Sequence, residues 1–349
     1  MPPEVATAID GLIGGQIEQR TTAAASIGVS GGGRLLLAHG YGHADREHGI
    51  AATGATRYRV GSLTKQFTAA SILLLAEQKE LAVDDLLARY VPEYTYAASI
   101  TLRQLLNECS GMSPNTTHAF AGVFGATTPA EAIAQLNHYP LDFAPGTQFA
   151  DAHVDYYMLG VVLERVAQMP YARFLQQRIA GPLGLVDTFL DGSRPDSAVA
   201  AAYNAVGGVL SAVKPWSVDY TFSAGGLVST VTDLLQWNAA LRNGQLLSAA
   251  SWQLMTTVPS LSPPSEYAMG LIVNAKGKAV RIWHSGRAGG AHAMDAQYRD
   301  VDRDVVVLAN TNGADCIAPE HLANVVVGLI EPRCAFAAKP SAAPKLPQV

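Results

Sequence analysis

The fold of this chain is decided by the segment Arg59-Val60-Gly61-Ser62-Leu63-Thr64-Lys65-Gln66-Phe67-Thr68-Ala69. Ser62 and Lys65 stand three residues apart, and an apolar run of helical length follows them as far as about Glu77. Residues i and i+3 lie on one face of a helix, so we expect the Lys65 amine to contact the Ser62 hydroxyl. Free backbone N–H groups at the start of this helix suit a developing oxyanion. The segment therefore predicts a nucleophilic serine with a lysine partner.

Two other serines compete for the same role. A serine and a lysine at this spacing occur by chance about once in a chain of this length. Ser211 has the spacing too, but Pro215 follows its lysine directly and no apolar helical run comes after it. Ser30 lies in a G-x-S-x-G pattern, which needs a helix after it, whereas a second strand is predicted there. Ser62 is therefore the preferred nucleophile, and the rest of the chain must decide the assignment.

The composition is that of a globular protein. The 349 residues are 49% hydrophobic and 15% charged, which is enough chain for a large core and one or two domains. The net charge is −5 without runs of Lys or Arg, so we expect no nucleic-acid partner. No apolar run has transmembrane length, so we expect no membrane partner. A small-molecule substrate is the expected partner, and the sequence indicates no oligomeric state.

The N-terminus and the cysteines bear on the cellular compartment. Met1-Pro2-Pro3-Glu4 has neither the basic nor the apolar region of a signal peptide. We therefore expect a cytoplasmic protein, or a periplasmic or secreted one if a signal peptide has been removed. Cys109, Cys316 and Cys334 are odd in number and have no C-x-x-C spacing, so they form neither a disulfide framework nor a zinc motif. They favour a reducing compartment.

Cofactor and metal motifs are absent from the sequence. The chain has neither a G-x-G-x-x-G fingerprint nor a P-loop. His39, His43 and His48 fall in a predicted strand and loop rather than on one helix face, unlike the H-E-x-x-H arrangement of zinc sites. We expect these histidines at the surface, and we predict no cofactor and no metal site.

The predicted elements divide the chain into three parts. An amphipathic helix over 4–19 and a hairpin of strands 24–30 and 34–39 open it. The middle predicts helices over 101–106, 129–136, 154–168, 171–179 and 230–242. The last part predicts strands over 268–274, 279–284, 293–298 and 304–310, then a helix over 319–330.

Strands at both ends of the chain predict one sheet that is built from both ends. We expect a discontinuous sheet domain of residues 1–85 plus 265–334 and an inserted helical domain of residues 86–264. Residues 335–349 are rich in Pro, Ala and Lys, which predicts a disordered tail.

Seven sequence blocks occur in order: Gly40-Tyr41-Gly42-x-Ala44-Asp45, the block 59–69, Leu105-Leu106-x-x-x-Ser110-Gly111, Pro145-Gly146-Thr147-x-Phe149, Tyr156-x-x-Leu159-Gly160, Ala224-Gly225-Gly226-Leu227-x-Ser229-Thr230-x-x-Asp233 and His284-Ser285-Gly286. In these blocks the chain resembles the serine β-lactamase and penicillin-binding-protein superfamily, above all class C β-lactamases and their esterase and D-peptidase relatives. The resemblance covers about residues 23–330. It implies an α+β, β-lactamase/transpeptidase-like fold, with an antiparallel sheet flanked by helices and a mostly helical inserted domain.

The resemblance also assigns roles to residues. Ser62 matches the acylated nucleophile of the family, and Lys65 matches its proton-transfer partner. His284-Ser285-Gly286 matches the third motif, K-T-G or H-T-G, at the end of a predicted strand. Gly286 would let this strand approach the substrate without a side chain. Arg287 should supply the second oxyanion N–H beside that of Ser62.

The second family motif is altered in this chain. The family has Y-x-N after P-G-T-x-F-x, and this sequence has Asp151-Ala152-His153 there. Asp151 replaces the tyrosine that serves as base or proton relay, and His153 replaces the asparagine that contacts lysine and substrate. The flanking blocks fix the register of this substitution.

Three hypotheses follow from the altered motif. In the first, Asp151 keeps Lys65 protonated as an electrostatic stabiliser, and His153 or Asp151 takes the Ser62 proton. In the second, Asp151 binds the free amine of a substrate. In the third, the site is degenerate and binds ligands without turnover. Tyr220, just before the Ala224 block, is a further expected pocket residue.

The prediction from sequence is therefore a serine hydrolase. Ser62 would attack an ester, a β-lactam or a peptide-like amide and form an acyl-enzyme, which water then hydrolyses. The alternative is a catalytically degenerate ligand-binding protein of the same fold. Loops around 115–125 and 205–220 are expected to shape the pocket.

Overall fold

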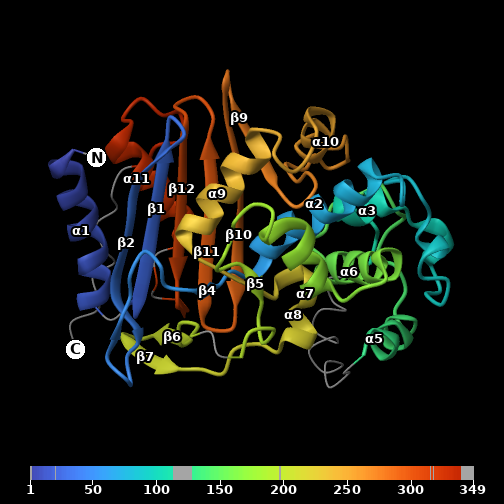
Figure 1. Ribbon diagram of the computed structural model, residues 1–349, viewed down its shortest axis with the longest axis horizontal. Coiled ribbons are helices and arrows are strands. Elements are labelled where there is room, and N and C mark those ends of the chain that lie inside the picture. Colours follow the sequence, from blue (N-terminus) through green and yellow to red (C-terminus); the bar gives the residue numbers. More distant parts are fainter. Residues whose placement is uncertain are drawn as a thin grey trace.

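The protein is built around a seven-stranded antiparallel sheet that both ends of the chain form together (Figure 1). A computed structural model describes residues 2–19, 21–112, 128–195, 198–314, 316 and 318–338. The sheet order is β3-β2-β1-β12-β11-β10-β9. The strands are β1 (Ala24–Gly31), β2 (Arg34–Asp45), β3 (Ile50–Ala51), β9 (Ile272–Lys276), β10 (Ala279–Ala288), β11 (Ala291–Tyr298) and β12 (Arg303–Ala309). The predicted sheet from both chain ends is confirmed.

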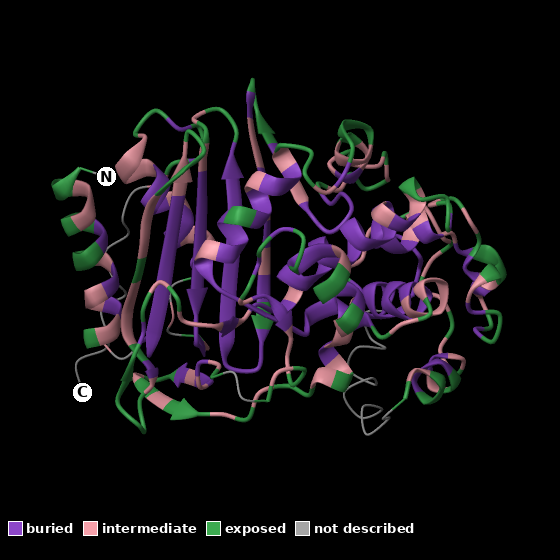
Figure 2. Ribbon diagram, viewed as in Figure 1, coloured by how far each residue is buried: buried purple, intermediate pink, exposed green. Residues whose placement is uncertain are grey.

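The central strands are buried on both faces (Figure 2). Side chains alternate between the two faces of a strand. In β12, Val305 and Val307 belong to the core beneath α1 (Pro3–Glu18) and α11 (Pro319–Ile330), whereas Val306 and Leu308 face the opposite core. That second core holds α2 (Thr64–Glu77) and α9 (Val231–Arg242). The helix that carries Lys65 is thus packed against the inner face of the sheet.

The helices of the middle part lie to one side of the sheet (Figure 1). They are α3 (Leu102–Leu106), α5 (Pro129–Leu136), α6 (His153–Ala167), α7 (Tyr171–Phe174), α8 (Val218–Gly225) and α10 (Ala249–Met255), with a π-helical turn at Leu175–Ala180 and 3-10 turns at Gly61–Leu63, Leu87–Arg89 and Ala97–Ser99. Capping boxes at Thr101 and Thr128 start α3 and α5. None of the helices in the described ranges has the length and apolar composition needed to cross a membrane.

Short strands in the middle part, and two short strands outside it that pair with them, were not predicted. One small sheet joins β4 (Tyr58–Arg59), β8 (Leu227–Ser229) and β5 (Phe189–Leu190), and another joins β13 (Thr311–Asn312), β6 (Tyr203–Val206) and β7 (Val209–Ala212). These strands are two to four residues long, too short to show alternation in the sequence. The prediction was a mostly helical middle part, and these short strands add to that prediction without contradicting it.

Three other predictions needed correction. The strand predicted from residue 268 begins at Ile272, because Gly270 has a φ of +72° and interrupts extended backbone. His284 lies inside β10 rather than at its end. The tail is ordered as far as residue 338, since Phe336 is buried beside Tyr298. Residues 339–349 and the whole predicted pocket loop at 115–125 lie outside the described residues.

Candidate active site

Ser62 sits in a tight turn that is pressed against strand β10. The 3-10 turn Gly61–Leu63 connects β4 to α2. Gly61 has a φ of +53°, and a Cβ there would come within 2.4 Å of the Arg287 carbonyl oxygen. A Cβ on Gly286 would come within 1.9 Å of the Val60 carbonyl oxygen. Both glycines are therefore required by direct backbone contact between the Ser62 turn and β10.

Two backbone nitrogens, those of Ser62 and Arg287, lie where the Ser62 turn meets β10. The backbone N, C and O of Arg287 all lie within 2.6 Å of the position that a Gly61 Cβ would occupy. In an antiparallel strand the N–H and C=O of one residue point to the same side, so the Arg287 N–H faces the Ser62 turn. The Ser62 nitrogen lies 2.9 Å from the position of a Gly286 Cβ. This arrangement has the form of an oxyanion-binding site.

A cavity of about 440 Å³ opens above the Ser62 turn. Its lining consists of Ser62, Phe149, Asp151, Tyr267, Ile272, His284, Ser285, Gly286, Arg287 and Glu320. Of the residues predicted from sequence, Ser62, Asp151 and the whole segment 284–287 therefore meet in one cavity. Lys65 lies beneath it with 1% of its surface exposed. His153 and Tyr220 are not among the lining residues.

Lys65 points to two carboxylates rather than to Ser62. Its Nζ donates to Glu108 Oε1 at 2.5 Å and to Asp151 Oδ1 at 2.8 Å. Within the described part of the chain, no hydrogen bond joins Lys65 to Ser62. The expected Ser62–Lys65 contact is thus corrected, because charged acceptors compete better for an ammonium than a hydroxyl does. The Glu108 side chain is fully buried, whereas the Asp151 side chain is 79% exposed.

The charges of this cluster fix its protonation states. Burial alone would lower the pKa of the Lys65 ammonium, but Glu108 and Asp151 outweigh it and raise this pKa above its usual value. The Lys65 charge lowers the pKa of Asp151 to about 2. Burial raises the pKa of Glu108 to about 8, against the attraction of Lys65. Lys65 is therefore a protonated ammonium at neutral pH, as the first hypothesis for the altered motif expects.

His153 begins helix α6 and is anchored to α8. Its Nε2–H donates to the Tyr220 carbonyl oxygen at 2.8 Å, and its ring stacks on Tyr220 at 4.8 Å. Burial lowers the pKa of His153 to about 4, so the imidazole is neutral at neutral pH. Its Cε1 and the Gly61 carbonyl carbon both lie 3.7 Å from the position of a Gly225 Cβ. His153 is thus close to the Ser62 turn, although no hydrogen bond joins His153 and Ser62 among the described residues.

His284 is held by its own strand. Its Nδ1–H donates to the Ser285 carbonyl oxygen at 2.5 Å, and its Nε2 faces the Tyr267 hydroxyl at 3.4 Å. Burial lowers the pKa of His284 to about 4, so this ring is also neutral at neutral pH. A neutral imidazole in the third motif adds no positive charge to the cavity. The exposed Arg287 guanidinium is the cationic side chain in the described lining.

Three residues of the site were not predicted from the sequence. Glu108 follows Leu105-Leu106 in the sequence. Tyr267 lies before β9, and Glu320 lies in the first turn of α11. Burial would raise the pKa of Glu320, but His292 and the Ser285 hydroxyl lower it to about 2. A single charged residue in the apolar 105–112 segment was the one available signal, and it pointed to Glu108.

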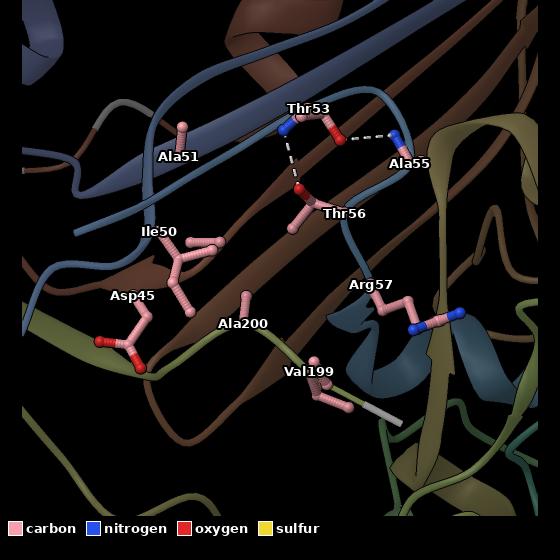
Figure 3. A pocket seen from close by; sticks show the side chains of 11 residues that line it. Asp45, Ile50, Ala51, Thr53, Ala55, Thr56, Arg57, Val199 and Ala200 are labelled. Atoms are coloured by element: carbon pink, nitrogen blue, oxygen red, sulfur yellow. Dashed lines mark hydrogen bonds between the residues drawn. The ribbon is translucent and has the colours of Figure 1, made fainter. Parts of the chain in front are cut away.

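A second cavity, of about 310 Å³, lies between the β2–β4 connection and residues 198–200 (Figure 3). Its charged lining residues are already paired, Asp45 with His48 and Arg57 with Asp187. Its threonines Thr53 and Thr56 bond to nearby backbone N–H groups. This cavity therefore lacks the reactive constellation that surrounds Ser62. In the ranges that the structure describes, no three His, Cys, Asp or Glu side chains gather in a way that could hold a metal ion.

Comparison with known proteins covers almost the whole chain. The family model described as Beta-lactamase matches residues 9–326. The putative penicillin-binding protein PbpX of Bacillus subtilis is 28% identical over 245 residues, which cover 69% of this chain and 60% of that protein. The chain spans about 60% of the length of the curated relatives it matches.

Solved structures share the fold. The octameric penicillin-binding protein homologue from Pyrococcus abyssi has a TM-score of 0.82 and 24% identity, over 97% of this chain and 79% of that one. A D-stereospecific amidohydrolase from Streptomyces sp. has a TM-score of 0.73 and 24% identity, over 88% of this chain and 93% of that one. The α+β arrangement of sheet and helices inferred from the sequence is the arrangement of these structures.

Proposed function

Because this chain belongs to the Beta-lactamase family, we propose that it is a serine hydrolase in which Ser62 forms an acyl-enzyme. The observation that carries the proposal is the position of Ser62, at a 440 Å³ cavity and where its turn meets the backbone of Gly286 and Arg287. The structural neighbours named as hydrolases support this reaction class. The substrate class is a carboxylic ester, a β-lactam or a peptide-like amide.

In the proposed reaction the Ser62 oxygen attacks the carbonyl carbon of the substrate. The carbonyl oxygen becomes an oxyanion that accepts hydrogen bonds from the backbone N–H groups of Ser62 and Arg287. The leaving group departs, and water then hydrolyses the acyl-enzyme. His284 and Ser285 form the wall of β10 along which the substrate lies, and Gly286 leaves room for it.

Lys65 and Asp151 act together in this proposal. The Lys65 ammonium lies beneath the cavity and stabilises negative charge that develops on Ser62. The Asp151 carboxylate holds that ammonium in place through the 2.8 Å contact. His153 remains a predicted base, with its Nδ1 free to accept because Nε2 donates to Tyr220. The family tyrosine is absent from this position, so the proton must take another route.

Mass spectrometry of the intact protein tests the proposal. The protein is exposed in turn to a fluorophosphonate, a penicillin and short-chain nitrophenyl esters, and we expect a single covalent adduct from at least one of them. Ser62→Ala should abolish this adduct. Ser30→Ala and Ser211→Ala are the matched controls, and both should be labelled as the wild type is. Equal labelling of Ser62→Ala at one site would show that the nucleophile is a different residue.

The degenerate ligand-binding alternative gives a different outcome. It predicts no adduct and no turnover of nitrophenyl esters or nitrocefin by the wild type. The double variant Asp151→Tyr plus His153→Asn restores the family motif. This variant should gain hydrolysis if the natural site is degenerate, and lose hydrolysis if the Lys65 cluster is tuned to this chain.

A further inference from the structure

Glu108 is a buried carboxylate whose contacts single it out. Its side chain is fully buried, and its Oε1 lies 2.5 Å from Lys65 Nζ. Its Oε2 has no hydrogen bond of standard geometry among the described residues, although Tyr267 faces the same carboxyl group. A buried carboxylate oxygen without a partner costs free energy unless the group carries a proton for part of the time. The geometry therefore leaves a proton-accepting position at the inner end of the Lys65 side chain.

The other groups around Lys65 are weaker acceptors. Asp151, with its pKa of about 2, holds a proton poorly near neutral pH. His153 has a pKa of about 4, and one of its ring nitrogens already donates to Tyr220. A general base works best when its pKa is close to the operating pH, and Glu108, at about 8, meets this condition.

We propose that Glu108 accepts the Ser62 proton through Lys65 during acylation. As the Ser62 oxygen bonds to the carbonyl carbon, its proton moves to Lys65 Nζ, while one Lys65 proton moves to Glu108 Oε1. The carbonyl π electrons move to the carbonyl oxygen. When the bond to the leaving group breaks, the proton returns from Glu108 through Lys65 to the leaving group. Lys65 keeps its charge throughout, and every proton is accounted for.

The first proton transfer, from Ser62 to Lys65, depends on how the start of α2 places these two side chains. Ser62 and Lys65 stand at i and i+3, so their side chains share one face. Contacts between nucleophile and base are often long in an empty site and tighten when substrate binds. Because Glu108 touches no reacting atom, it is a positioning residue that acts through Lys65. The inference rests on the proposed acylation of Ser62.

The surroundings of Glu108 define what can titrate with it. The titratable groups that face it are Lys65 from α2, the adjacent Cys109, Asp151 before α6, Asp155 and Tyr156 from α6, and Tyr267 before β9. Burial raises the pKa of Asp155, of Cys109 and of both tyrosines, which favours the neutral form of each of these groups. Lys65 and Asp151 balance each other in charge. A transition near pH 8 then belongs to Glu108.

The test is the pH dependence of acylation in Glu108→Gln. This variant keeps an oxygen for Lys65 to contact but cannot take up a proton. Single-turnover acylation by a nitrophenyl ester should fall about 10²-fold or more in the variant. The wild-type rate should rise with pH through about 8, and this limb should vanish in Glu108→Gln. Asp151→Asn is the matched control, because it removes the other carboxylate on Lys65, and it should keep the limb.

A second measurement does not depend on the folding of the variant. Wild-type acylation in mixtures of H₂O and D₂O should give a curved proton inventory, because two protons move together. A straight inventory, or an unchanged limb in folded Glu108→Gln, would overturn the relay while leaving Ser62 acylation intact. If the wild type forms no adduct with any probe, the proposed function fails, and the relay fails with it. The two failures are therefore distinguishable.

Discussion

The two sides of the Ser62 cavity are built in different ways. The strand side is the segment His284–Arg287 of β10. Its backbone lies so close to the Ser62 turn that a Cβ on Gly61 or Gly286 would collide with the facing backbone. The charged side is Lys65 with Glu108 and Asp151, whose side chains come from three separate segments. The strand side depends on main-chain geometry and needs glycine at fixed points. The charged side depends on which ionisable groups are present, so it can change its chemistry while the fold stays the same.

This contrast fits the position at which the sequence is expected to differ from the family motif that it resembles. The departure lies at residues 151–153, on and next to the charged side, whereas the third motif keeps its glycine. A Cβ at residue 286 would collide with the Val60 carbonyl, so that position tolerates little. On the charged side one acid can replace another polar group if the net charge around Lys65 stays balanced. Substitutions can therefore test the strand side and the charged side separately.

The largest effect is expected for Lys65→Met on the charged side. Removing the ammonium leaves the buried Glu108 without its counter-charge, which typically costs about 3–5 kcal/mol of the free energy of unfolding. The deficit should grow as pH rises above about 8, because Glu108 beside Lys65 ionises near that pH, whereas without Lys65 it must stay neutral in the folded protein. Chemical denaturation at several pH values measures it. Lys278→Met, at an exposed turn, is the control and should change stability by less than about 0.5 kcal/mol.

A large effect is also expected for Gly286→Ala on the strand side. The new Cβ would lie 1.9 Å from the Val60 carbonyl oxygen and 2.9 Å from the Ser62 nitrogen. Relief of this clash should cost about 1–3 kcal/mol of stability and should slow acylation about 10²-fold by displacing an oxyanion donor. Gly14→Ala in α1 is the control, because nothing lies within 4 Å of its Cβ position. If Gly286→Ala and Gly14→Ala have the same stability and the same acylation rate, backbone contact does not define the strand side.

The sequence predicted the strand side better than the charged side. The resemblance of His284-Ser285-Gly286 to the third family motif, on a predicted strand, located the 284–287 segment, and the sheet followed from strands at both chain ends. Glu108 was missed because it is 43 residues from Lys65 in the chain and no local pattern links them. The direction of the Lys65 side chain was also missed. Helix spacing permitted a contact with Ser62, but competition from two carboxylates cannot be derived from spacing.

The contribution of Asp151 to stability should be small despite its contact with Lys65. Its side chain is mostly exposed, and such ion pairs contribute about 0.2–1 kcal/mol. Because its pKa is lowered to about 2, this stabilisation is present above the pKa of an unfolded aspartate and is lost as pH falls through about 2. The free energies of unfolding of Asp151→Asn and of the wild type should therefore become equal in acid. Asp84→Asn, which breaks the exposed pair with Arg103, is the control and should leave acylation unchanged.

The smallest effect is expected for His153→Asn, and it separates the two proton routes. If Glu108 accepts the proton through Lys65, this variant should acylate within about tenfold of the wild-type rate and keep the limb near pH 8. If His153 is the base, acylation should instead fall as pH drops through about 4, where its imidazole gains a proton. That acid limb should then disappear in His153→Asn. Stopped-flow acylation from about pH 3.5 to about pH 10, with Tyr220→Phe as a control that keeps the carbonyl contact, decides between them.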